Sequence, residues 1–170
     1  MSDPYAAFEE FSATISGRFS RGPFRERIDV PRLRTVISIR HGKGDPWLWY
    51  VREVNTSHRH RFRFKGDSPW KRLLFLVGDR VKLPSLKTSI NEQSLLPVMA
   101  ELPSLPASAK IELSRYDKSG FVWWSAPAHC QCINATMNAR GLSRQSLDSL
   151  HSVVCGLAAV LESETENPAP

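Results

Sequence analysis

The sequence lacks the features that define several large classes of protein. It contains three cysteines in 170 residues, an odd and small number that argues against a disulfide framework. No stretch approaches the roughly 18 consecutive apolar residues that a membrane-spanning helix needs. The N-terminal segment has neither the basic start nor the apolar run of a secretory signal. Together these absences predict a reduced, cytoplasmic protein without a membrane span.

Recognised catalytic and cofactor-binding motifs are also missing. The chain has no G-x-S-x-G elbow, no P-loop, no Rossmann fingerprint, no HExxH and no EF-hand loop. The five histidines do not have a spacing that favours a general acid–base pair. We therefore predict no catalytic residues and no cofactor. The alternative is a small enzyme whose site is assembled from histidine, arginine and lysine residues that are distant in sequence.

One cluster of soft ligands occurs at His129, Cys130 and Cys132. Structural zinc sites space paired cysteines by about two to four residues and draw four ligands. Here one residue separates the cysteines, and the sequence has no second cysteine pair. We therefore predict no metal site and interpret the cysteines as small buried thiols.

Positive charge is concentrated in the first half of the chain. The net charge is +6, but residues 18–82 contain seventeen lysines and arginines against six acidic residues. That segment carries +11 and the remainder −5. Such asymmetry favours an acidic or polyanionic partner.

Amphipathic helices are predicted at both ends of the sequence. Near the N-terminus, Phe8, Phe11 and Ile15 form one apolar stripe, and Gly17 is suited to end the helix in the left-handed conformation. Near the C-terminus, Ser143 can cap a helix. The apolar stripe of that helix comprises Leu147, Leu150, Val153, Val154, Leu157, Val160 and Leu161.

Between these helices, alternating apolar residues predict antiparallel strands. The predicted strands cover 34–40, 47–54, 59–65, 71–77, 109–116 and 121–126, with a further short strand or loop at 128–133. The run 71–77 is apolar on both faces, which places it centrally in the sheet. A short helix is expected near 97–102, within a proline-rich segment.

This pattern predicts an α+β fold. We expect a single domain over 1–162, with a mostly antiparallel sheet of about five to seven strands flanked by the N-terminal and C-terminal amphipathic helices. Residues 163–170 are polar and acidic and are expected to form a flexible tail.

A row of cations in the strand 59–65 is the main functional signal. Successive side chains of a strand point to opposite faces, so the cations would share one face, and His60, Phe62 and Phe64 the other. Arg34 and Arg40 have matching parity and are expected on the same face of a neighbouring strand. The predicted anion-binding residues are Arg34, Arg40, Arg59, Arg61, Arg63 and Lys65.

Three functional hypotheses follow from this row and from the helices. The first is a non-catalytic binding domain whose basic sheet face binds nucleic acid or an acidic protein, with tryptophans available for base stacking. The second is the small enzyme described above. The third is a homo-oligomeric adaptor that pairs through the apolar stripe of the helix from Ser143 to Leu161. Against the first stands a structural interpretation, in which the cations are the solvated side of a half-buried strand and the tryptophans pack in the core.

Overall fold

The computed structural model describes residues 4–23, 25–41, 43–55, 61–66, 74–77, 80–82, 92–114 and 130–166. These residues form three α-helices, two 3-10 helices and nine strands of one antiparallel sheet, which confirms the predicted α+β class. The helices are α1 (Pro4–Thr14), η1 (Pro31–Leu33), α2 (Glu92–Glu101), η2 (Leu102–Ser104) and α3 (Arg144–Glu166). The strands are β1 (Arg18–Gly22), β2 (Arg25–Val30), β3 (Thr35–Arg40), β4 (Trp47–Asn55), β5 (Arg61–Lys65), β6 (Leu74–Val77), β7 (Arg80–Lys82), β8 (Lys110–Ser114) and β9 (Cys130–Asn138).

The strand order shows how the chain builds this sheet. The order is β1-β2-β3-β4-β9-β8-β5-β6-β7, and every adjacent pair is antiparallel. The first four strands form one meander and β5, β6 and β7 form another. The last two strands, β8 and β9, lie between these meanders and join them. The central pairing is therefore made by segments that are far apart in the sequence.

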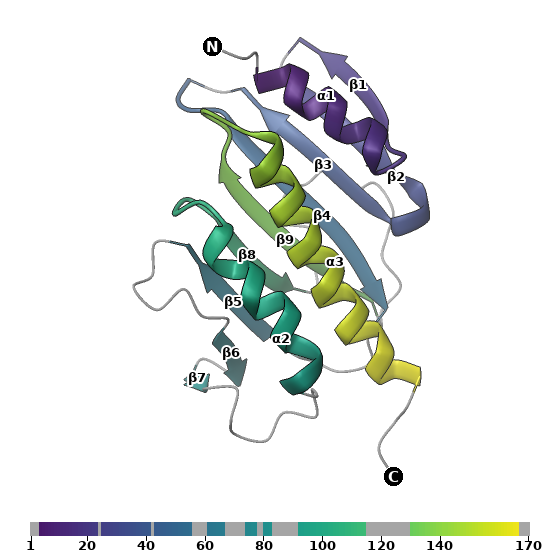
Figure 1. Ribbon diagram of the computed structural model, residues 1–170, viewed down its shortest axis with the longest axis vertical. Coiled ribbons are helices and arrows are strands. Elements are labelled where there is room, and N and C mark those ends of the chain that lie inside the picture. The colour runs from purple at the N-terminus through teal and green to yellow at the C-terminus, as the bar shows by residue number, and fades with distance from the viewer. Residues whose placement is uncertain are drawn as a thin grey trace.

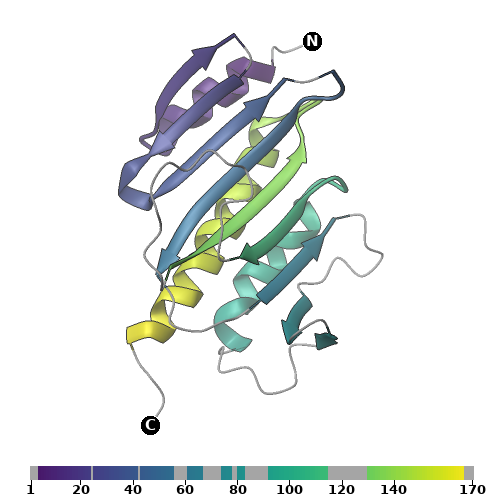
Figure 2. The same ribbon diagram turned by 180° about the vertical axis from the view of Figure 1, so that it is seen from behind.

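All three α-helices lie on one side of the sheet (Figure 1). The reverse view shows the strands in front and the helices behind them (Figure 2). Helix α1 packs on β1, α3 packs on β4 and β9, and α2 packs against α3. None of the described helices is both long and apolar enough to cross a membrane.

The core lies between these helices and the sheet. Phe8 and Phe11 of α1 are buried there, as the stripe predicted. The predicted stripe of the C-terminal helix is also buried within this single chain, and Ser143 caps α3 by accepting a hydrogen bond from the backbone N–H of Ser146 at 3.1 Å. Because the sheet covers this stripe within the chain, the stripe is not available for pairing between subunits.

The C-terminal end of α1 differs from the prediction at Gly17. Ser16, with φ of 53°, is the residue in the left-handed conformation. The backbone N–H of Gly17 donates to the carbonyl of Ser12 at 2.8 Å, which is the arrangement of a Schellman motif. Gly17 is needed for space instead, since a Cβ there would lie 2.4 Å from Cγ2 of Ile28 in β2.

The predicted position of the apolar run 71–77 is wrong. Its described part, β6, lies between β5 and β7, next to the edge of the sheet. An apolar run predicts burial but carries no information on strand order, which pairing between distant segments decides. The sheet is also larger than expected, because β1, β2 and β7 were not predicted as strands. The predicted strand 121–126 lies outside the described residues, and β8 pairs with β5 and β9.

The extended conformation of the cationic segment is confirmed where the structure describes it. Residues 61–65 form β5, in which Phe64 is buried and Lys65 is exposed. Arg59 and His60 lie outside the described residues. At the other end of the chain, α3 continues to Glu166, so its last turn extends into the segment 163–170 that was expected to be a flexible tail.

Candidate functional site

Strand β4 separates two chemically different sides of the sheet. Leu48, Tyr50 and Val54 point toward the helices and belong to the core. Trp47 and Trp49 alternate with them and therefore point to the opposite side, where Trp47 is 37% exposed and Trp49 is half-buried. We call this opposite side, on which no described helix lies, the helix-free face (Figure 2).

The strand register extends this face across the sheet. Trp49 pairs with Thr136 in β9, Thr136 pairs with Lys110 in β8, and Lys110 pairs with Lys65 in β5. Directly paired residues of an antiparallel sheet point to the same side, with Cβ atoms about 4.5–5.5 Å apart. The register therefore places the exposed side chains of Lys65 and Lys110 next to each other. The half-buried Trp49 lies in the same row, two strands from Lys110.

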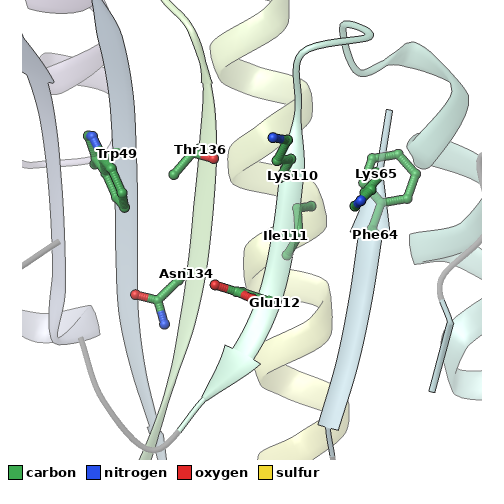
Figure 3. Close-up of a pocket in the computed structure, with 8 residues that line it drawn as sticks. All are labelled: Trp49, Phe64, Lys65, Lys110, Ile111, Glu112, Asn134 and Thr136. Atoms are coloured by element: carbon green, nitrogen blue, oxygen red, sulfur yellow. The ribbon is translucent and has the colours of Figure 1, made fainter. Parts of the chain in front are cut away.

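A hollow of about 260 Å³ lies along this row. The described residues that line it belong to β4, β5, β8 and β9, with Trp49 at one end and Lys65 at the other (Figure 3). The lining residues are Trp49, Phe64, Lys65, Lys110, Ile111, Glu112, Asn134 and Thr136. The described part of the lining thus combines two ammonium groups with one carboxylate, one amide, one hydroxyl and an indole ring, and it contains no histidine.

Hydrogen bonds hold one polar group of this lining in place. The amide nitrogen of Asn134 donates to the hydroxyl of Ser114 at 3.0 Å and to the carbonyl of Cys132 at 3.1 Å, and the residue is buried. A polar group held by bonds within the sheet loses little conformational freedom when a ligand arrives.

Cations outnumber carboxylates on the helix-free face. Two of the carboxylates have cationic partners of their own: Asp29 is paired with Arg27 at 2.6 Å, and the buried Glu53 is paired with Arg34. The charged residues that the register and ion pairs place on this side are Arg18, Arg25, Arg27, Asp29, Arg34, Arg40, Glu53, Lys65, Lys110 and Glu112. Counted over the described side chains, seven cations against three carboxylates give this side a positive excess.

The six predicted anion-binding residues are not brought together as one cluster. Arg34 and Arg40 are on the same side as Lys65, as parity predicted, but β4, β9 and β8 separate β3 from β5. Four strand spacings correspond to about 19 Å, so the expectation of neighbouring strands is wrong. Arg34 precedes β3 with φ of 45° and is paired with Glu53.

The remaining arginines of the row are described in part or not at all. Arg61 and Arg63 belong to β5, and the backbone register pairs Arg63 with Glu112. The side chains of Arg61 and Arg63, and the whole of Arg59, lie outside the described part of the chain. Their role in anion binding stays a prediction.

Several residues of the hollow were not singled out from the sequence. Lys110 lies in a strand that was predicted, and its alternation with Ile111 and Leu113 is a signal that places it on the outer face. Asn134 and Thr136 lie beyond the short strand or loop expected at 128–133, because β9 continues to Asn138. Both residues were missed because the strand expected at 128–133 was predicted too short.

A second polar cluster lies on the helix side, between α3 and β4. The hydroxyl of Tyr50 is 2.8 Å from Nδ1 of His151, and Nε2 of His151 is 3.5 Å from the sulfur of Cys155. Nη1 of Arg52 donates to the same sulfur at 3.0 Å. The imidazole of His151 is half-buried, with its ring edge-on to Phe11.

Burial shifts two pKa values in this cluster. Burial of the phenol raises the pKa of Tyr50 well above its usual value, and the neighbouring Cys155 adds to the increase. Burial of the imidazole, and then the charge of Arg52, lower the pKa of His151. At neutral pH, Tyr50 is therefore protonated and His151 is neutral, so the Tyr50 hydroxyl can donate to Nδ1 of His151.

A histidine–carboxylate pair lies near the N-terminal helix. Nε2 of His41 is 2.6 Å from Oε2 of the buried Glu26, and the hydroxyl of Tyr5 is 3.3 Å from Nδ1 of His41. Arg21 lies 3.8 Å from the other oxygen of Glu26. No spacing in the sequence connects His41 to Glu26; the pairing of β2 with β3 brings the two together.

The predicted thiol cluster is described only in part. The thiol of Cys132 is buried, as expected, whereas His129 and the side chain of Cys130 lie outside the described residues. Across the described ranges, no three histidine, cysteine, aspartate or glutamate side chains gather in a group that could hold a metal ion.

Comparison with known proteins finds no match for this chain among protein-family models, curated proteins or solved structures.

Proposed function

We propose that this protein is a non-catalytic binding domain whose helix-free face binds an acidic partner, and that single-stranded nucleic acid is the partner it fits best. The pairing of Lys65 with Lys110 is the observation that carries this proposal. Like charges directly opposite each other on one face of a sheet are destabilising. An anion bound between these two exposed lysines would offset that repulsion.

The aromatic side chains distinguish nucleic acid from an acidic protein. Trp47 and Trp49 are two residues apart on one strand and share the helix-free face. Proteins that bind single strands combine a cationic track for phosphates with exposed rings on which bases stack. A chain of aspartates and glutamates would use the lysines and have no comparable use for the indole rings.

The composition of the hollow also favours binding over catalysis. Among the described residues that line it, Glu112 is the carboxylate and there is no histidine, so these residues do not themselves supply the histidine–carboxylate pair of a ribonuclease-like mechanism. A base edge entering the hollow would meet the hydroxyl of Thr136 and the amide of Asn134.

Fluorescence anisotropy with a labelled single-stranded oligonucleotide tests this proposal. Binding should weaken steeply between about 50 and 200 mM salt, because phosphate contacts release counterions. Lys110→Ala should weaken binding severalfold and reduce the slope of log K against log salt by about one. Trp49→Ala should weaken binding with a smaller change in slope, since stacking releases no counterions.

Matched controls make the result specific to this face. Arg144→Ala removes one charge on the helix side, where Arg144 is paired with Asp148 at 2.9 Å, and it should leave the salt slope unchanged. Polyglutamate of similar length tests the acidic-protein alternative. If polyglutamate binds more tightly than the oligonucleotide, and Trp49→Ala does not weaken that binding, the partner is an acidic protein and not nucleic acid. Absence of binding to both polyanions at about 50 mM salt would overturn the proposal.

A further inference from the structure

The described lining of the hollow separates hydrogen-bond donors from acceptors. One cross-strand row holds Lys110 opposite Lys65, whose ammonium groups only donate. The next row along β8 holds Glu112 opposite Asn134. The carboxylate of Glu112 accepts hydrogen bonds. The amide nitrogen of Asn134 already donates two hydrogen bonds within the sheet, so this side chain offers its carbonyl oxygen to a ligand. A donor row therefore lies beside an acceptor row.

The carboxylate of Glu112 is not explained by phosphate binding. It repels phosphates and so reduces the attraction that the two lysines create. The register also places Glu112 opposite Arg63 of β5. A carboxylate has about four lone-pair positions, so a partner on the neighbouring strand still leaves positions for a ligand. A ligand that carries N–H donors next to acceptors would use both rows, whereas a bare phosphate would use the lysines and be repelled by Glu112.

Guanine is the nucleobase whose edge matches this order best. It presents two adjacent acceptors, N7 and O6, and then two adjacent donors, N1–H and the N2 amino group. Adenine and thymine alternate donors and acceptors along their edges, and cytosine has a single donor group, its N4 amino group. Lysine commonly donates to O6 and N7 of guanine. A carboxylate such as that of Glu112 can accept from N1–H and the N2 amino group together.

The spacing of the lining suits one stacked base. Trp49 lies two strands from Lys110, a separation of about 10 Å. Thr136 and Asn134 lie between these two strands, on β9 (Figure 3). A base that stacks on the indole ring therefore lies over β9 and turns its edge toward β8. The volume of about 260 Å³ is at the small end for ligand pockets, which fits one base and not a run of bases.

We infer that the hollow binds a guanine base of the single-stranded nucleic acid and that Glu112 selects this base. The inference rests on the proposed function, because it takes the helix-free face as the binding surface. Trp49 stacks on the base, Lys110 donates to O6 or N7, and Glu112 accepts from N1–H and the N2 amino group. The ammonium group of Lys110 has three N–H donors, so it can contact a phosphate as well as the base.

Fluorescence anisotropy with oligothymidylates that differ only in one central base tests the inference on the unchanged protein. The central base is guanine, adenine, cytosine, thymine or hypoxanthine, which is guanine without the N2 amino group. The guanine strand should bind at least about fivefold more tightly than the thymine strand, with the hypoxanthine strand between them. Equal affinity for the guanine and thymine strands, or tightest binding of another base, would overturn the inference and leave the proposed function standing. Absence of binding to every strand would overturn both.

Glu112→Gln separates base selection from general electrostatics. The loss of a negative charge should tighten binding of the thymine strand, while the preference for guanine should fall below about twofold, because the charged acceptor is lost. Asp29→Asn is the matched control, since it removes a carboxylate on the same face but outside the described lining of the hollow. It should tighten all strands by the same factor and leave the preference unchanged.

A folded Glu112→Gln protein that keeps the full preference for guanine would contradict the role of Glu112. If that variant does not fold, the comparison of the guanine, hypoxanthine and thymine strands on the wild-type protein still decides whether the hollow binds guanine.

Discussion

The two sides of β4 differ in what their polar side chains do. On the helix side, Tyr50 and Arg52 are buried and contact named partners in α3. On the helix-free face, Trp49 lines a hollow with Lys65 and Lys110, and the strand register places those two lysines directly opposite each other. One side uses polar groups to complete a packed interface, and the other presents them in a concave surface. We propose that the packed helix side mainly stabilises the fold and that the helix-free face serves recognition.

Leu150→Ala should produce the largest loss of stability, and it tests whether the helix side of the sheet is the part that stabilises the fold. Leu150 is completely buried between α3 and the sheet, so its truncation leaves a cavity and should cost about 2–5 kcal/mol of unfolding free energy. Urea unfolding measures the change, with Ser152→Ala on the exposed side of the helix as a control. A loss below about 1 kcal/mol would show that the helix side is not a well-packed core.

Tyr50→Phe should have the next largest effect. The change removes the hydroxyl that contacts His151 at 2.8 Å and leaves a half-buried imidazole without that partner, at a cost of about 1–3 kcal/mol. The oligonucleotide affinity of the folded variant should be unchanged. Loss of affinity without loss of stability would reverse the roles assigned to the two sides.

The pH dependence of stability should differ between wild type and His151→Gln. Burial and the charge of Arg52 lower the pKa of His151 below the value of about 6.5 that it has in an unfolded chain. The unfolded state therefore binds a proton more readily, and the contribution of His151 is fully present above pH 6.5 and is lost as the pH falls below it. Urea unfolding at several pH values should show a steeper acid loss in wild type than in the variant. Parallel curves would contradict the burial of His151.

Lys65→Glu should have the smallest effect on stability and the opposite sign. It replaces a like-charge pair with an opposite-charge pair facing Lys110, which should stabilise the fold by a few tenths of a kcal/mol and at most about 1 kcal/mol. The same change should weaken oligonucleotide binding strongly, because it places a carboxylate in the hollow. A variant that is both less stable and fully competent in binding would remove the basis for assigning recognition to this face.

The sequence predicted the elements better than their arrangement. Alternation identified the inner and outer faces of β3 and of the described end of β5, and the stripe from Leu147 to Leu161 identified α3, since these patterns depend on local geometry alone. Strand order depends on pairing between distant segments, so the positions of β6 and of Arg40 relative to Lys65 were wrong. The short, highly charged strands β1 and β2 have too few apolar residues to be recognised.

The residues of the candidate sites could likewise be predicted only where they depend on local sequence pattern. Lys65 was identified because it belongs to a visible row of cations, whereas its partner Lys110 comes from a strand 45 residues later in the sequence. The contacts of Cys155 with Arg52 and of His41 with Glu26 arise only when helices and strands pack together. Composition indicated an acidic partner, but the hollow could be found only from the fold.

The most direct test of the helix-free face is an NMR titration of the tryptophan indole N–H signals with a single-stranded oligonucleotide at low salt. Trp→Phe variants assign the individual signals. We predict that the signals of Trp47 and Trp49 shift as the oligonucleotide binds, while the backbone signals of exposed residues in α3, such as Ser152 and Ala159, remain in place. Shifts in α3 with unchanged Trp47 and Trp49 signals would contradict the proposal that this face is the binding surface.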